Sequence, residues 1–238
     1  GIPVYKHDEF TNGIVYVDLA FDFGELTERQ EALLNVLGAA FGEIGLPDVP
    51  FDVLNHEIAL KTGGISAFVG HQTRFADLTI VRRLFIVRLK ALAHSWPEAA
   101  DLLVRILRET TFSDTVRLRQ IIDELHEEIQ SALIPNGHYF AGLRAGSGAH
   151  GIIRLEERMN GISQVGSLES FVTEIDNDPA ALGRQLDGLL TELVDPVRMA
   201  VNVTGETRSV EQVTQWLPEL VGSLHDRRVR GGIRESRN

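Results

Sequence analysis

The sequence predicts an α+β fold in which helices pack mainly on one face of an antiparallel sheet. The expected elements follow the order β-α-α-β-β-α, then a block of helices and a returning β-α. Two expected strands are adjacent in the chain, which favours antiparallel pairing over a doubly wound parallel sheet. The 238 residues are 43% hydrophobic and 24% charged, a composition typical of a globular chain with a sizeable core.

The first expected strand covers residues 13–23, where apolar residues are nearly continuous. Residues 1–9 before it are polar and predict an irregular segment, and Asn12-Gly13 predicts a turn. Thr27 and Gln30 have capping-box spacing, in which each side chain bonds a free backbone N–H. They therefore predict a helix start, and the helix is expected to end before Gly45.

A second helix is expected at Phe51–Lys61, ended by Gly63-Gly64. Ile65–Val69 then predicts a short strand, and Leu78–Ala93 predicts a much longer one. In the longer strand, basic side chains alternate with apolar ones, which indicates that one face of the sheet is at least partly exposed to water.

The remaining elements are mostly helices with recognisable starts and stops. Ser95 with Pro97, Ser113, Asp178-Pro179, and Ser209 with Gln212 have the residue types of helix N-termini. The expected segments are a helix that begins near Ser95, a helix from Ser113 to Pro135, a glycine-interrupted helical stretch over 137–159, helices over 168–175 and 179–194, a strand over 197–203 and a last helix to about Leu224. Residues 1–225 are expected to form one domain, and the arginine-rich residues 226–238 a flexible tail or linker to a next domain.

Charge and composition exclude several classes of protein. The net charge of −11 argues against a nucleic-acid partner, and no run of about 20 apolar residues predicts a membrane span. The chain has no cysteine, which excludes disulfides, cysteine nucleophiles and thiolate metal sites. It begins with glycine rather than methionine and shows no targeting leader, so we expect a piece of a longer protein.

Motif analysis from residue chemistry alone does not indicate an enzyme. Residues 146–151 match G-x-G-x-x-G, but no strand is expected before the glycines, as a dinucleotide site requires. His56-Glu57 begins like the zinc motif H-E-x-x-H, but Leu60 stands where the second histidine is needed. The inverted motif H-x-x-E-H and the serine elbow G-x-S-x-G are absent from the sequence, and the eight histidines are scattered singly.

Three stretches carry a specific resemblance to a known family. They are VYKHDEFTNGIVYVDL at residues 4–19, KTGGIS at residues 61–66 and SALIPNGH at residues 131–138. Each resembles the segment that follows the central linker in presequence-protease-like zinc metallopeptidases, the branch of the insulinase (pitrilysin) family that includes falcilysin. MNGIS at residues 159–163 and DND at residues 176–178 fit the same pattern, so the resemblance covers nearly the whole chain.

The resemblance implies a parent enzyme of four related α+β domains, in two halves that close around a peptide. In that family the first domain carries H-x-x-E-H, whose histidines and a more distant glutamate hold zinc while the motif glutamate activates water. This sequence resembles the third domain, and the repeated domain pattern sets Leu34, Leu37 and Gly38 at the positions of the motif. These residues offer no ligand atom and no base, so no catalytic residue, no metal ligand and no cofactor is expected in this chain, with zinc expected only in the parent.

The resemblance therefore implies a non-catalytic domain that forms part of the wall of the closed proteolytic chamber of a zinc metalloendopeptidase, which degrades unfolded peptides. A stand-alone structural subunit of the same fold, without peptidase activity, is the alternative. A third reading, an independent small-molecule enzyme whose histidines and glutamates converge in space, would require a pocket with perturbed titratable groups. The expected partners are the remaining domains of the parent and peptide substrates, with no nucleic acid and no membrane.

The candidate substrate-binding strand follows Gly63-Gly64, because in a catalytic domain of the family such glycines precede a strand that lies beside bound peptide. It comprises Ile65, Ser66, Ala67, Phe68 and Val69. An exposed strand edge adds a peptide through backbone hydrogen bonds and so tolerates many sequences. The alternative is that the glycines only end the preceding helix and that this strand is an ordinary member of the sheet. The compartment expected for the protein is the cytoplasm if bacterial and an organellar matrix if eukaryotic.

Overall fold

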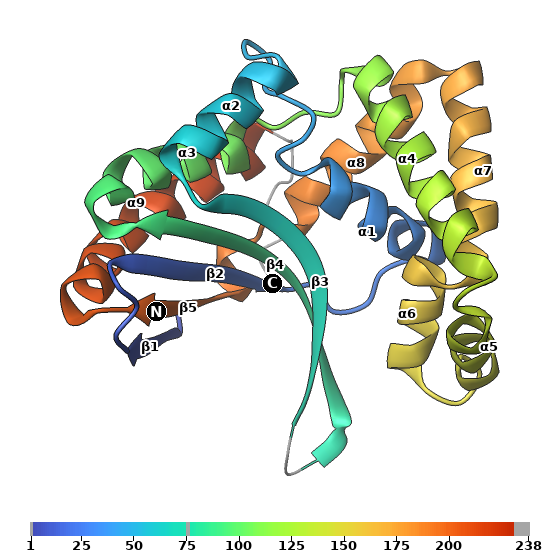
Figure 1. Ribbon diagram of the computed structural model, residues 1–238, viewed down its shortest axis with the longest axis horizontal. Helices are drawn as coiled ribbons and strands as arrows, with labels where there is room; N and C mark the ends of the chain where they lie inside the picture. The colour runs from blue at the N-terminus through green and yellow to red at the C-terminus, as the bar shows by residue number, and fades with distance from the viewer. Residues whose placement is uncertain (1, 75–76, 231–238) are drawn as a thin grey trace.

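A computed structural model describes residues 2–74 and 77–230, which form a mixed sheet and a set of helices (Figure 1). The order of the strands across the sheet is β1-β5-β2-β4-β3. The strands are β1 (Val4–Asp8), β2 (Ile14–Asp22), β3 (Gly64–Arg74), β4 (Asp77–Leu92) and β5 (Met199–Gly205). The α+β class is therefore confirmed, and each of the four expected strands is present.

The expectation of a wholly antiparallel sheet is wrong at one edge. The polar segment that was expected to be irregular is β1, and it pairs parallel with β5 in a register that sets Val4 opposite Val201. The other pairs, β2–β5, β2–β4 and β3–β4, are antiparallel. Because β1 is stabilised by a segment almost 200 residues away, its own short sequence shows no strand period.

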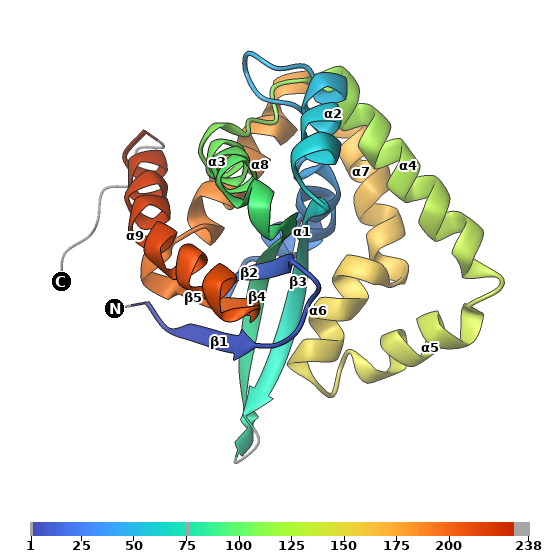
Figure 2. The ribbon, with the colours of Figure 1, turned by 60° about the vertical axis from the view of Figure 1, so that its left-hand side comes forward.

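The helices fall into a layer on the sheet and a lobe beside it (Figures 1 and 2). Their bounds are α1 (Glu28–Ala40), α2 (Phe51–Lys61), α3 (Trp96–Glu109), α4 (Thr115–Leu133), α5 (Gly137–Gly146), α6 (Gly151–Asn160), α7 (Ile162–Asn177), α8 (Pro179–Leu193) and α9 (Thr207–Arg230), with 3-10 turns η1 (Ala93–Ser95) and η2 (Pro196–Arg198). Helices α1, α3 and α9 pack against strands, whereas α4 to α7, here called the helical lobe, pack on one another and on α1.

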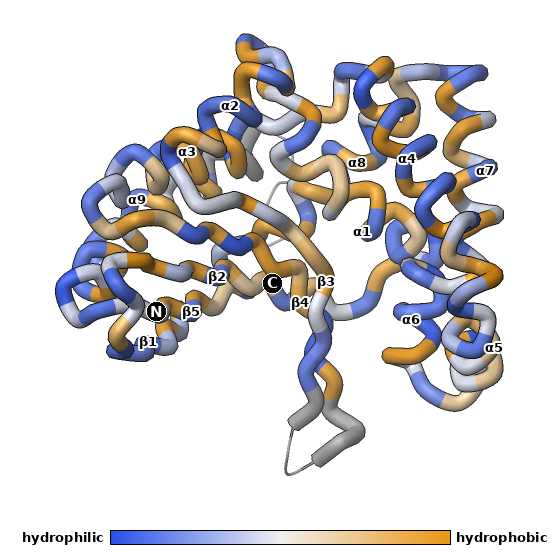
Figure 3. The backbone as a smooth tube through the Cα atoms, in the orientation of Figure 1, coloured by the Kyte–Doolittle hydropathy of each residue, from blue (hydrophilic) through white to orange (hydrophobic). Residues whose placement is uncertain are grey.

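The core lies between one face of the sheet and the helix layer. Along β2, Val15, Val17, Leu19 and Phe21 are fully buried, whereas the residues between them are only partly buried. The same alternation occurs along β5. Helices therefore cover mainly one face of the sheet, as predicted, and Figure 3 shows polar residues interspersed along the strands.

Helix termini agree with the sequence signals in part. The capping box of Thr27 and Gln30 is formed at α1. Asp114, not Ser113, caps α4 by accepting from the Arg117 N–H. The box expected at Ser209 is also wrong, because α9 begins at Thr207 and continues past Leu224 to Arg230. No helix within the described residues is long and apolar enough to cross a membrane.

Strands β3 and β4 continue beyond the rest of the sheet as a two-stranded arm. The last residue of β2, Asp22, pairs with Leu84, and beyond that pair β4 has only β3 as a neighbour. The arm extends away from the body of the molecule in both views (Figures 1 and 2). Strand β3 is thus an edge strand along its whole length.

Candidate functional site

The candidate substrate-binding strand, residues 65–69, lies within β3 at the edge of the sheet. Strand β4 pairs with one side of β3, and no strand among the described residues pairs with the other. An edge strand offers a row of backbone N–H and C=O groups to an incoming strand. Which residues supply that row depends on the phase of the hydrogen bonds in the sheet.

The phase is fixed by bonds at the two ends of the β2–β4 ladder. The Phe23 N–H donates to the Arg83 carbonyl over 3.1 Å, and the Ala93 N–H donates to the Gly13 carbonyl over 2.8 Å. Both belong to the same register as the ladder between them. In an antiparallel ladder, alternate residues bond the same neighbour. Odd-numbered residues of β4 therefore direct their backbone groups to β2, and even-numbered residues direct theirs to β3.

The same alternation assigns the backbone groups of β3. Ser66 pairs with Arg88 and Phe68 pairs with Ile86, so the N–H groups of Ser66 and Phe68 bond within the sheet. The residues between them point their backbone groups outward. The sequence-predicted set thus divides in two, and its outward donors are Ile65, Ala67 and Val69.

Two glycines bring the chain from α2 into this strand. The Thr62 Oγ1 donates to the Ile58 carbonyl at the end of α2 and accepts from the Gly64 N–H over 2.9 Å. Gly64 has φ +130°, a conformation that side-chain-bearing residues rarely adopt. The Gly63 N–H donates to the Lys90 carbonyl over 2.6 Å. The glycines therefore both follow the helix end and set the start of the β3–β4 pairing.

Helix α1 passes close to the outer edge at Ala67. A Cβ added at Gly38 would lie 3.1 Å from the Ala67 carbonyl oxygen, so only glycine allows this approach without displacement. Leu34 and Leu37, the other two positions set against the zinc motif, are 1% and 0% exposed in the core. The three positions aligned with H-x-x-E-H are therefore filled by aliphatic packing and a close backbone contact, and they do not fit a zinc ion.

The open face beside β3 carries an aromatic and ionic cluster. Phe68 is 36% exposed, and the guanidinium of Arg88 lies 5.2 Å from the centre of its ring. Arg88 also binds Asp18 through two hydrogen bonds of 2.7 and 3.0 Å. These hydrogen bonds, followed by the attraction of the carboxylate, raise the pKa of Arg88. The cluster fixes Phe68 as an apolar surface next to the free edge.

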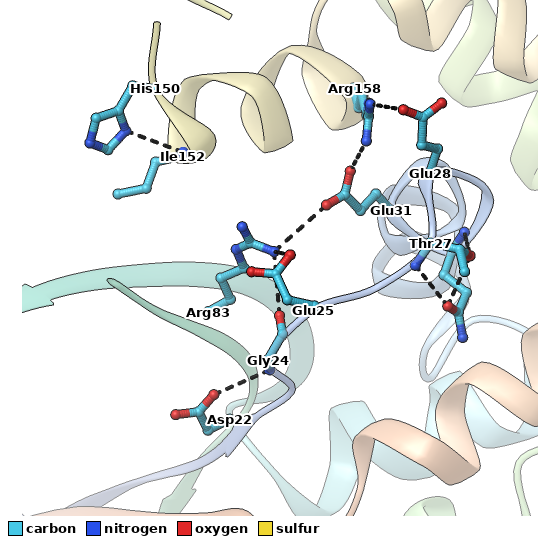
Figure 4. Close-up of polar contacts among 11 residues, drawn as sticks. Asp22, Gly24, Glu25, Thr27, Glu28, Glu31, Arg83, His150, Ile152 and Arg158 are labelled. Atoms are coloured by element: carbon cyan, nitrogen blue, oxygen red, sulfur yellow. Dashed lines mark hydrogen bonds and ion pairs between the residues drawn. The ribbon is translucent and has the colours of Figure 1, made fainter. Parts of the chain in front are cut away.

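A charged network joins the base of the arm to α1 and the helical lobe (Figure 4). Glu31 on α1, with 7% of its side chain exposed, contacts Arg83 of β4 over 3.8 Å and is also bound by Arg158 of α6. Arg83 contacts Glu25 over 3.0 Å, and Arg158 binds Glu28. Burial disfavours the charge of Arg158, but its bonds to the two carboxylates raise the pKa of the guanidinium. Since a buried carboxylate requires such partners, the network fixes the lobe relative to β4.

The other motifs considered in the sequence do not form sites here. Residues 146–151 connect α5 to α6 rather than a strand to a helix, and the His150 Nδ1 accepts from the Ile152 N–H at the start of α6. His56 is exposed on α2, and the Lys61 hydrogen bond to Glu57 lowers the pKa of that carboxyl. Among the described residues, no group of three His, Cys, Asp or Glu side chains is arranged to hold a metal ion.

Structural comparisons show that this arrangement of sheet and helices is a known protease fold. A conserved protein from Enterococcus faecalis superposes with a TM-score of 0.60 at 13% identity, over 89% of this chain and 48% of that one. The periplasmic protease PqqL from Escherichia coli superposes with a TM-score of 0.56 at 13% identity, over 90% of this chain and 21% of PqqL. At this identity the likeness concerns the fold.

Sequence comparison identifies the family. Residues 1–171 match the model of the domain associated with peptidases of family M16, subfamily C, and the chain belongs to that peptidase-associated family. Presequence protease 1 of Arabidopsis thaliana, chloroplastic/mitochondrial, is 28% identical over 94% of this chain, and the mitochondrial presequence protease of Danio rerio is 22% identical over 99%. The chain spans 21% and 23% of the length of these two relatives.

Proposed function

We propose that this chain is a non-catalytic domain of a zinc metalloendopeptidase that degrades unfolded peptides, and that it forms part of the wall of the closed proteolytic chamber. The observation that carries the proposal is the match of residues 1–171 to the peptidase-associated family. Presequence proteases contain a related segment that makes up about a fifth of their length. If the parent is eukaryotic like these two relatives, an organellar compartment is consistent with their printed locations.

The buried packing at Leu34, Leu37 and Gly38 supports a non-catalytic role, because no lone pair or base is present at the positions that align with the zinc motif. Zinc chemistry would then be supplied by another domain of the parent. In that enzyme this chain would bind and orient substrate and enclose it.

The outer edge of β3 supports a role in holding substrate. Its outward N–H groups at Ile65, Ala67 and Val69 would bond the backbone of an extended peptide, and the exposed ring of Phe68 would contact one of its side chains. Backbone bonding requires an unfolded substrate but little sequence specificity. This matches an enzyme that degrades peptides of many sequences.

Metal content and activity test the non-catalytic assignment. We expect the purified chain, after dialysis, to hold far less than one zinc per molecule by elemental analysis and to cleave no unfolded peptide. The full-length parent, as the positive control, should hold zinc and lose activity on chelation. Stoichiometric zinc in the chain alone, or chelator-sensitive cleavage that persists through repurification, would refute the assignment.

A further inference from the structure

One exposed part of the helical lobe is almost free of charge. Between Glu128 and Arg154 the sequence holds 25 residues, of which Arg144 alone is Asp, Glu, Lys or Arg. At the 24% charged composition of the whole chain, about six would be expected. A segment with so few charges normally lies in a protein interior.

This segment is instead mostly exposed. We define the elbow as residues 131–143, which comprise the end of α4, its turn and the first part of α5. Ile134 is 92% exposed and Tyr139 is 43% exposed, while Phe140 is the elbow residue that is buried. Figures 1 and 2 show α5 at the outer end of the lobe, away from β1, β2 and β5. Helix α5 packs mainly on α6.

An exposed surface of this kind has the composition of a protein interface. Single exposed apolar residues are common, but charged residues are depleted specifically at the centres of interfaces. Ala141 and Gly142 on the exposed side of α5 carry little or no side chain, so a partner surface could approach the helix backbone closely. Ile134 projects from the turn and would be the apolar anchor.

We propose that the elbow docks on an uncharged, apolar surface of the remainder of the parent peptidase. This rests on the proposed function, since it takes the chain as one domain of a larger enzyme. About four fifths of the length of the two presequence proteases lies outside the matched segment, so such a partner would be tethered and always near. A lipid surface fits less well, because Glu124, Glu127 and Glu128 on α4 precede the elbow and would be repelled by anionic headgroups.

The test uses Ile134→Asp, with Val116→Asp as its matched control. Val116 lies at the opposite end of the same helix and is 70% exposed, so the substitution adds the same charge at a similar apolar site. Both variants should retain the thermal midpoint of the wild-type chain, because neither side chain is buried. The chain and the remainder of the parent are expressed separately and mixed, and their Kd is measured by calorimetry.

We expect Ile134→Asp to weaken this association at least tenfold and Val116→Asp to change it by less than twofold. In the full-length enzyme, amides of residues 131–143 should exchange more slowly than in the chain alone, and Ile134→Asp should remove that difference. Association that is unaffected by Ile134→Asp would overturn the elbow proposal alone. Absence of any association between the wild-type pieces would overturn the proposed function as well.

Two further results would replace the partner. Self-association of the chain by sedimentation, lost in Ile134→Asp, would assign the elbow to a second copy. Binding of the chain to vesicles of phosphatidylcholine and phosphatidylglycerol, lost in the same variant, would assign it to a lipid surface. Either result would overturn docking on the peptidase remainder.

Discussion

Replacing Gly183 with alanine should lower the free energy of unfolding by about 2–3 kcal/mol. Gly183 is on α8, and a Cβ built there would lie 2.2 Å from the Phe112 carbonyl oxygen and 3.1 Å from its carbonyl carbon. These are backbone atoms, so no side chain can rotate to make room. The Phe112 side chain is fully buried, and α8 would have to move away from the segment between α3 and α4.

Gly188→Ala provides the control on the same helix. An added Cβ at Gly188 meets nothing within 4 Å, so alanine should stabilise the protein by about 0.5–1 kcal/mol through its greater helix propensity. Urea unfolding measures both values. Equal effects of the two substitutions would show that the close approach of α8 to Phe112 is not present in solution.

Proline at Phe68 should also lower the free energy of unfolding by about 2–3 kcal/mol, because its N–H bonds β4 and its loss leaves the Ile86 carbonyl without its partner. Proline at Val69 should cost much less, since the Val69 N–H points outward. Each proline is compared with alanine at the same position, so that the loss of the side chain is subtracted.

The difference between proline and alanine is then the quantity of interest at each site. It should be large at Phe68 and small at Val69. The reverse order would mean that the outward donors are at Ser66 and Phe68, and the assignment of the free edge to Ile65, Ala67 and Val69 would be wrong.

Local signals predicted much of the fold. The capping box at Thr27, the proline near the start of α3 and the glycines after α2 act within a few residues, so the sequence shows them directly. Strand β1 was missed because its pairing with β5 is distant in sequence and its exposed residues carry no apolar alternation. The cap of α4 was displaced by one residue, since Ser113 and Asp114 are both suitable caps and only the backbone decides between them.

The candidate site was predictable as a strand but not as an edge with a phase. Ile65 to Val69 could be selected from the glycines before it, whereas the position of β3 at the edge depends on the order of all five strands. The outward direction of the Ala67 N–H depends further on the β2–β4 register. The network around Glu31 was also missed, because Arg83 and Arg158 are far apart in the chain and no local pattern links them.

Amide hydrogen exchange of β3, measured by NMR on the 238-residue chain with and without a saturating unfolded peptide, tests the central claim most directly. Without peptide, the Ser66 and Phe68 amides should exchange slowly and those of Ile65, Ala67 and Val69 quickly, because only the first two bond β4. Peptide should slow exchange at Ile65, Ala67 and Val69 and leave Ser66 and Phe68 unchanged. Bound peptide that leaves these three amides exchanging at their original rates would contradict a substrate strand on the edge of β3.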